Sequence, residues 1–211
     1  MSGTPPPVVV PSTLFQKTSR WFERATAALL GQVPCQAGCC RCCIGPFPIT
    51  ILDRKSVQRG LLQLSDTQRR AIQQRAVTQV TAMEAAFPQL AASPLLDHWP
   101  DPVVEQLVER FADLPCPALD SEGHCAIYAF RPLTCRSMGI PSEEAGTVEG
   151  ACDIQTSIPI IRLSPALRRE EEQLAGEEAA QLAALQQEQS AEGEELLLPY
   201  AFLPEKPHQT R

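Results

Sequence analysis

Five cysteines occur within nine residues, in the run Cys35-Gln-Ala-Gly-Cys39-Cys40-Arg-Cys42-Cys43. A buried thiol packs as a small hydrophobe, so core packing gives no reason for five of them in one short run. Thiolates are soft ligands for thiophilic metals, and this is the direct physical use of such a run. The remaining cysteines form a second thiol-bearing stretch: Cys116, Cys125, Cys135 and Cys152. The sequence therefore predicts a metal-binding protein with two cysteine segments.

The number and setting of the cysteines argue against a disulfide framework. Their total, nine, is odd, and two pairs are vicinal, Cys39-Cys40 and Cys42-Cys43. Residues 1–11 contain no basic region followed by an apolar run, and no stretch approaches the ~18–20 apolar residues of a membrane span. We therefore expect a cytoplasmic protein without membrane association, in which clustered thiols serve metal or redox chemistry.

Composition indicates the fold class. Aromatic residues make up only 5% of the 211-residue chain, so the core must be built from aliphatic side chains, which favours packed helices. Twenty prolines and eleven glycines place much of the rest in turns and loops. The expected fold is mainly α: an irregular helical domain with few or no strands, whose two cysteine-bearing loops meet at a metal centre. The net charge of −7 makes nucleic-acid binding unexpected.

Four segments follow from the pattern along the chain. They are a disordered Pro-rich N-terminus (1–12), a cysteine-cluster metal-binding domain (13–163), an acidic helix (164–195) and a tail (196–211). Apolar spacing predicts helices over about 14–30, 50–64, 65–87, 101–111 and 164–190. The expected caps are Ser12 or Thr13, Thr50 or Asp53, the Ser65 capping box, and Asp101 before a proline.

The charged residues are unevenly distributed. Nine acidic residues and two arginines between Arg168 and Glu195 give this segment −7, equal to the charge of the whole chain. A basic run precedes it: Arg54, Lys55, Arg59, Arg69, Arg70 and Arg75. A solvated helix face is the expected role of this run, and an acidic partner or the acidic helix itself is the alternative.

The first segment contains two C-x-x-C pairs, Cys39 with Cys42 and Cys40 with Cys43. This spacing lets two sulfurs face one ion, and it suits a zinc tetrathiolate and an iron–sulfur cluster equally. Adjacent side chains project in different directions, so Cys39 and Cys40 are not expected to serve the same centre.

Other residues near the cysteines are candidates for supporting roles. Three arginines, Arg41, Arg131 and Arg136, are placed to offset thiolate charge and to donate hydrogen bonds to sulfur, with solvated surface charge as the alternative. His124 precedes Cys125, and we expect it to face solvent rather than bind metal. Tyr128 and Phe130 are expected to pack in the core.

Together these motifs resemble the YkgJ-type cysteine-cluster family, also called CxxCxxCC, a zinc- or iron-chelating domain. The resemblance covers about residues 35 to 152 and includes the Arg131-Pro132 step. The matching cysteines, which the resemblance implies as metal ligands, are Cys35, Cys39, Cys42, Cys43, Cys116, Cys125, Cys135 and Cys152. Cys40 falls at a variable position of the pattern and receives no role from it.

The leading functional hypothesis is a protein whose eight thiolates hold one or two centres, with an iron–sulfur cluster preferred over a zinc or iron ion. A redox role, similar to an iron–sulfur oxidoreductase, and an unknown protein or redox partner would follow. The alternatives are a zinc-stapled helical interaction module and a role in protein N-methylation, since a flagellin lysine N-methylase has a similar cysteine pattern. A radical-SAM enzyme also uses the first three-cysteine spacing, but Arg41 stands where an aromatic residue is usual. No catalytic set is evident, so the sequence leaves enzymatic activity undecided.

Overall fold

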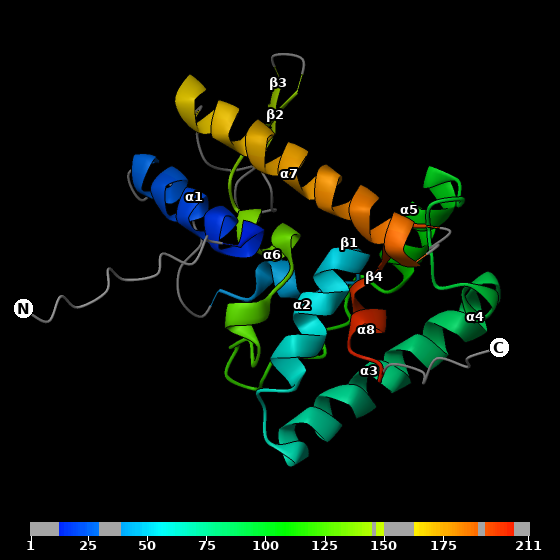
Figure 1. The fold of residues 1–211 in the computed structure, drawn as a ribbon. Helices are drawn as coiled ribbons and strands as arrows, with labels where there is room; N and C mark the ends of the chain where they lie inside the picture. Colours follow the sequence, from blue (N-terminus) through cyan, green and yellow to red (C-terminus); the bar gives the residue numbers. More distant parts are fainter. Residues whose placement is uncertain (1–12, 30–38, 145–146, 150–162, 190–192, 205–211) are drawn as a thin grey trace, which may run out of the picture.

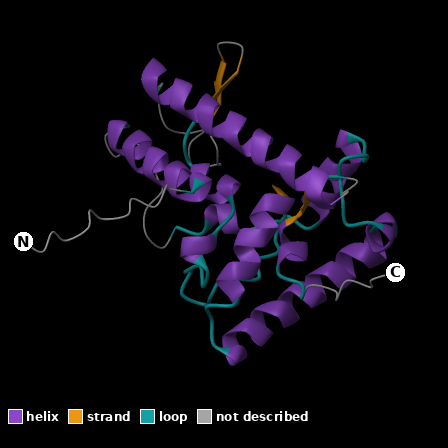
Figure 2. Ribbon diagram, viewed as in Figure 1, coloured by secondary structure: helices purple, strands orange, loops and turns teal. Residues whose placement is uncertain are grey.

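The computed structural model describes residues 13–29, 39–144, 147–149, 163–189 and 193–204 (Figure 1). Within these ranges the fold is mainly α, as predicted, with short strands in two two-stranded sheets (Figure 2). The predicted N-terminal segment 1–12, Cys35, Cys152 and residues 205–211 lie outside the described residues.

The described elements follow one another in this order: α1 (Leu14–Ala28), η1 (Arg41–Cys43), β1 (Pro48–Thr50), α2 (Ile51–Leu61), α3 (Asp66–Ala86), α4 (Gln89–Ala92), α5 (Asp101–Arg110), η2 (Tyr128–Phe130), α6 (Leu133–Ser137), β2 (Ser142–Glu144), β3 (Thr147–Glu149), α7 (Pro165–Gln189), β4 (Glu195–Leu197) and α8 (Leu198–Ala201). Here η marks a single turn of 3₁₀-helix. None of the described helices combines the length and the apolar character needed to cross a membrane.

Capping side chains fix where three of the helices begin. Thr13, Thr50 and Ser65 each accept a hydrogen bond from the backbone N–H three residues later, and each forms a full capping box. These predicted caps are confirmed. The predicted cap at Asp101 is wrong by one residue, because the N–H groups of Val103 and Val104 already bond to the carbonyl of Pro100, which makes Asp101 the first helical residue.

The main core lies between α2, α3 and the C-terminal elements β4 and α8. β4 pairs antiparallel with β1, so that Ile49 stands opposite Leu196, and both side chains are buried. α8 contacts both α2 and α3 (Figure 1). On α2, the Gln58 amide donates to the carbonyls of Ala201 and Leu203.

The segment from residue 196, expected to be a tail, is therefore built into the core in its described part. The reason is its apolar run, in which every side chain from Leu196 to Phe202 is buried. Burying such side chains stabilises the fold by about 1.5–3 kcal/mol each, which a free tail would forfeit.

The acidic helix α7 packs along α1 (Figure 1). Trp21, Ala25 and Leu29 form a small core with Leu163 and Ile140, and the Trp21 indole donates to the carbonyl of Leu167.

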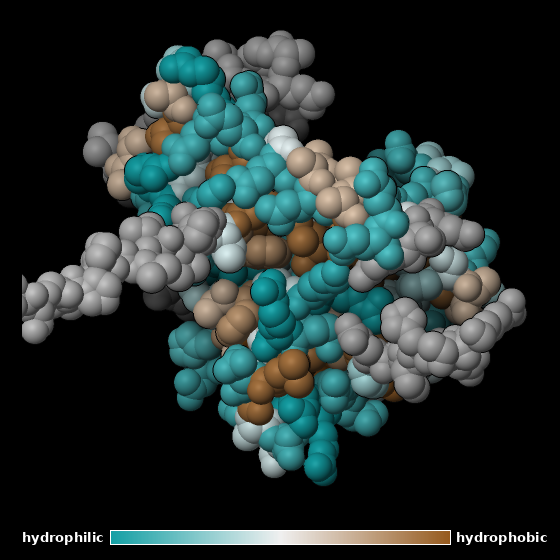
Figure 3. All heavy atoms as spheres, in the orientation of Figure 1, coloured by the Kyte–Doolittle hydropathy of each residue, from teal (hydrophilic) through white to brown (hydrophobic). Residues whose placement is uncertain are grey.

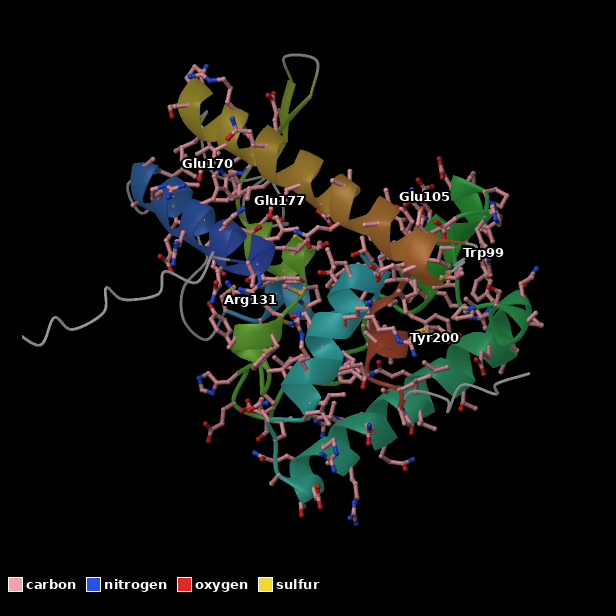
Figure 4. All side chains as sticks on the ribbon, in the orientation of Figure 1. Trp99, Glu105, Arg131, Glu170, Glu177 and Tyr200 are labelled. Atoms are coloured by element: carbon pink, nitrogen blue, oxygen red, sulfur yellow. The ribbon has the colours of Figure 1, made fainter. Side chains whose placement is uncertain are left out.

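Ion pairs join the same two helices. Lys17 pairs with Glu177 at 2.7 Å, and Arg24 pairs with Glu170; Figure 4 shows both glutamates on the α1 side of α7. The partner of the acidic helix in these contacts is thus α1 rather than the basic run of α2 and α3.

Candidate metal centre

A short backbone ladder joins the two cysteine segments. The N–H of Cys116 donates to the carbonyl of Cys43 at 2.7 Å, and the N–H of Gly45 donates to the carbonyl of Leu114 at the same distance. Gly45 has φ +91°, a left-handed conformation that side chains rarely adopt, and its Cα faces the backbone of Ala112. Residues about seventy positions apart in the sequence are therefore held side by side at the cysteines themselves.

A tight loop then brings Cys125 back toward Cys116. The Asp120 carboxylate accepts hydrogen bonds from the N–H groups of Glu122 and His124, and Gly123 takes a positive φ of 84°. A bridge between Leu119 and Cys125 closes the loop. The third thiol is in this way placed by local turn chemistry.

Two polar residues of α3 hold the carbonyls on either side of Cys116. Gln79, a buried side chain, donates to the carbonyl of Pro115 at 2.8 Å, and Arg75 donates to that of Pro117 at 2.9 Å. Arg75 belongs to the basic run, for which the sequence predicted a solvated helix face, and Gln79 was not singled out from the sequence. Their spacing of four residues places both side chains on one face of α3. This spacing is visible in the sequence, but their hydrogen-bond acceptors are known only once the loop around Cys116 is placed.

Asp53 joins α2 to the part of the second cysteine segment that carries Cys135. Its carboxylate completes the capping box of α2 through the N–H of Thr50 and accepts the N–H of Leu133 at 2.8 Å. Leu133 begins α6, the short helix that carries Cys135, so one buried carboxylate caps two helices. Burial raises the pKa of Asp53, and the hydrogen bonds and the Arg136 charge oppose that shift.

η2 packs directly on α2, between Cys125 and α6. Ser56 donates to the carbonyl of Phe130 at 3.1 Å. A methyl group added at Gly60 would lie 2.7 Å from Cβ of Phe130 and 3.1 Å from Cβ of Ile127. The absence of a side chain at Gly60 is what allows this close approach.

The three arginines expected near the cysteines have different settings. Arg136 is buried: it donates to the carbonyls of Arg131 and Ala129 and to the Ser19 hydroxyl of α1, so it anchors the loop before Cys135. Arg131 lies 3.9 Å above the Tyr128 ring. Its positive charge adds to the lowering of the Cys42 pKa, which a hydrogen bond with the Cys43 thiol mainly causes, and it opposes the rise of the Cys125 pKa that burial causes. Arg41 is exposed on η1, as the solvated alternative predicted.

Three neighbouring residues were also assigned from the sequence. His124 is exposed, as expected, beside the carboxylates of Asp120 and Glu122. The prediction that Tyr128 packs in the core is wrong, because its side chain is 64% exposed and is covered by Arg131 instead. Phe130 does pack against the main core.

Five of the described thiols lie near enough to affect one another's ionisation: Cys42, Cys43, Cys116, Cys125 and Cys135. A hydrogen bond between neighbouring thiols lowers the pKa of Cys42 and raises that of Cys43. Burial raises the pKa of Cys116 to about 12 and also raises those of Cys125 and Cys135, with charge on the other thiols adding to each rise. Cys42 is therefore the thiol that ionises most readily, whereas the other four resist ionisation unless a cation compensates their charge.

These observations test whether the site suits a metal. All seven described cysteines are free thiols, and five of them converge from both segments. Within the described residues, no three Cys, His, Asp or Glu side chains form a group arranged to hold a metal ion. Sulfur-only donors, partial burial and adjacent guanidinium groups nonetheless fit a thiophilic metal better than any hard cation.

The fold and the thiol cluster indicate a class of protein, a helical metal-binding domain whose cysteines come from two loops. A family model described as "CxxCxxCC: Putative zinc- or iron-chelating domain" matches residues 34–153, more than half of the chain. The chain belongs to this family, which confirms the resemblance drawn from the cysteine pattern. No curated protein and no solved structure matches the chain.

Proposed function

We propose that the converging thiols hold an iron–sulfur cluster and that the protein transfers electrons in the manner of an iron–sulfur oxidoreductase. The observation that carries this proposal is the backbone hydrogen bond from the N–H of Cys116 to the carbonyl of Cys43, which brings the two cysteine segments together. An iron–sulfur cluster uses four thiolates, and five described thiols lie near enough here to affect one another's pKa, although no three of the described side chains are arranged to hold a metal ion.

The proposed ligands are drawn from eight cysteines. Those within the described residues are Cys39, Cys42, Cys43, Cys116, Cys125 and Cys135, and the family pattern adds Cys35 and Cys152. A bound cluster would supply one-electron chemistry there. The roles of this chain's own residues are to place sulfur through Asp53, Arg75 and Gln79 and to offset negative charge through Arg131. An electron-transfer role implies a protein redox partner and a reducing compartment such as the cytoplasm.

Anaerobic purification followed by iron, sulfide and zinc analysis, visible absorption and electron paramagnetic resonance tests this proposal. We expect a brown protein with stoichiometric iron and sulfide. Cys116→Ser and Cys135→Ser should lose most of the iron, whereas the matched variant Cys40→Ser should retain it, because Cys40 stands outside the family pattern. Full iron retention in both Cys116→Ser and Cys135→Ser would refute the proposed ligand set.

A zinc-stapled interaction module is the second candidate. The observation that favours it is the shortness of the elements around the thiols, since η1, η2 and α6 have three to five residues each. Such elements gain little stability by themselves, and a structural zinc site contributes about 10 kcal/mol or more of folding free energy. A colourless protein that contains zinc, lacks iron and unfolds on chelation would select this candidate.

A role in protein N-methylation ranks behind both. S-adenosylmethionine binding favours a Gly-rich turn from a strand into a helix, and in the described residues β1 leads into α2 through Thr50 without a glycine.

A further inference from the structure

A concave site lies at the corner between α2 and α3, and none of the described cysteines lines it. Its volume is about 610 Å³, within the range of ordinary ligand sites. The residues that line it come from both helices and from the end of the described chain: Leu52, Lys55, Gln58, Arg59, Leu61, Leu62, Arg69, Gln73 and Pro204.

The wall of this corner pocket is largely apolar. Leu62 follows the last residue of α2 and is 69% exposed, the most exposed large hydrophobic side chain among the described residues. Leu61 and Pro204 extend the apolar wall. Figure 3 shows a brown patch surrounded by teal over this end of α2. An exposed leucine at the rim of a pocket is a candidate contact for an apolar side chain of a ligand.

The polar part of the lining has one sign of charge. Lys55, Arg59 and Arg69 are cationic, and the lining includes no carboxylate. Arg69 is paired with Asp66, which is exposed beside it. For Lys55 and Arg59, no described carboxylate forms an ion pair, and both side chains are exposed one turn apart on α2. In a chain of net charge −7 this corner stands out as locally basic.

From this combination we infer that the corner pocket binds an acidic peptide segment of a partner protein, with a leucine-like side chain against Leu62 and carboxylates facing Lys55 and Arg59. The charge complementarity selects an acidic occupant, and the apolar wall selects one with an aliphatic anchor. A few residues of extended peptide match the size of the pocket. This binding role is independent of the metal centre.

Four synthetic dodecapeptides of equal length test the inference: acidic with leucines, basic with leucines, acidic with serines, and neutral with leucines. Binding to the full-length protein is followed by calorimetry and by two-dimensional NMR. We expect saturable binding of the acidic leucine peptide alone, with shifts confined to residues 52–62, 69–73 and 204, and weaker affinity at higher salt.

Two pairs of variants sharpen the test. The double variant Lys55→Glu/Arg59→Glu and the variant Leu62→Asp should each weaken binding about tenfold or more, which corresponds to about 1.4 kcal/mol. Arg70→Glu and Val77→Asp are matched controls on α3, because both residues are exposed and neither lines the pocket. They should bind as the wild type does.

Three results with the peptides and variants would overturn the inference. They are no binding of the acidic leucine peptide at millimolar concentration, equal binding of the basic leucine peptide, and equal losses in the α3 controls. Octanoate is included as a small amphipathic carboxylate. If it binds as tightly as the peptide and to the same residues, the pocket is a small-molecule site and the peptide assignment is wrong.

Discussion

Replacing Gly60 by alanine should destabilise the protein, although alanine is the better helix former. The added methyl group would lie 2.7 Å from Cβ of Phe130 and 3.1 Å from Cβ of Ile127, against about 3.5–4.0 Å for ordinary carbon contacts. Neither neighbour is the far end of a flexible side chain, because both atoms are attached directly to the backbone. Relief therefore requires η2 to move away from α2.

The magnitude follows from two opposing contributions. Overpacking a well-filled interior costs about 1–3 kcal/mol. Removing a glycine from a helix gains about 1 kcal/mol through helix propensity and the lower entropy of the unfolded chain. The net expectation for Gly60→Ala is a loss of up to about 2 kcal/mol in the free energy of unfolding.

Gly176 supplies the matched control. It lies in α7, and a methyl group there would meet nothing within 4 Å, so Gly176→Ala should raise stability by about 0.5–1 kcal/mol. Urea denaturation of the two variants and the wild type, at one metal occupancy, measures both changes. Because η2 lies between Cys125 and Arg131, Gly60→Ala should also weaken metal binding, whereas Gly176→Ala should not. Equal stabilisation by the two substitutions would refute the close packing of α2 and η2.

Three further variants test other parts of the structure. Burial raises the pKa of Glu178 to about 7, so folding favours its protonated form, and stability falls as the pH rises from about 4.5 to about 7. Glu178→Gln should flatten this fall and raise the free energy of unfolding by about 1 kcal/mol at pH 8, a value discounted for the partial exposure of the side chain. The control variant Glu172→Gln, at an exposed position, should show neither effect. Parallel urea titrations across this pH range measure both variants. Asp53→Ala should lower the free energy of unfolding in urea by about 1–3 kcal/mol, because the buried N–H of Leu133 loses its acceptor. Asp53→Asn keeps an oxygen that can accept this N–H, so equal losses in the two variants would argue against this account. Phe202→Ala should cost about 3–5 kcal/mol in thermal unfolding, and a change below 1 kcal/mol would contradict the place of α8 in the core.

Local signals in the sequence predicted the features that depend on a few neighbouring residues. The caps at Thr13, Thr50 and Ser65 need only a side chain and the N–H group three residues away, and all three are confirmed. The mainly α class follows from composition, and the meeting of the cysteine segments follows from the chemistry of thiols. The metal assignments of individual cysteines remain predictions.

Features that depend on distant parts of the chain could not be predicted in this way. The apolar run from Leu196 gives no sign that its partner is β1, almost 150 residues earlier. Arg75 looks like any surface arginine until the Pro117 carbonyl is placed beside it. Tyr128 stays 64% exposed and stacks with Arg131 instead of packing in the core, a contact that aromatic character alone does not indicate.

The pairing of β1 with β4 has a consequence for the order of events during protein synthesis. β1 and α2 emerge early from the ribosome, but the side chains that cover them, from Leu196 to Phe202, lie near the end of the described residues and are translated late. The thiols of both cysteine segments are therefore translated before the hydrophobic core can close. Premature termination just before residue 196 would leave Ile49 and Val57 without the side chains that bury them, so the metal site of such a truncated chain would lack its folded support.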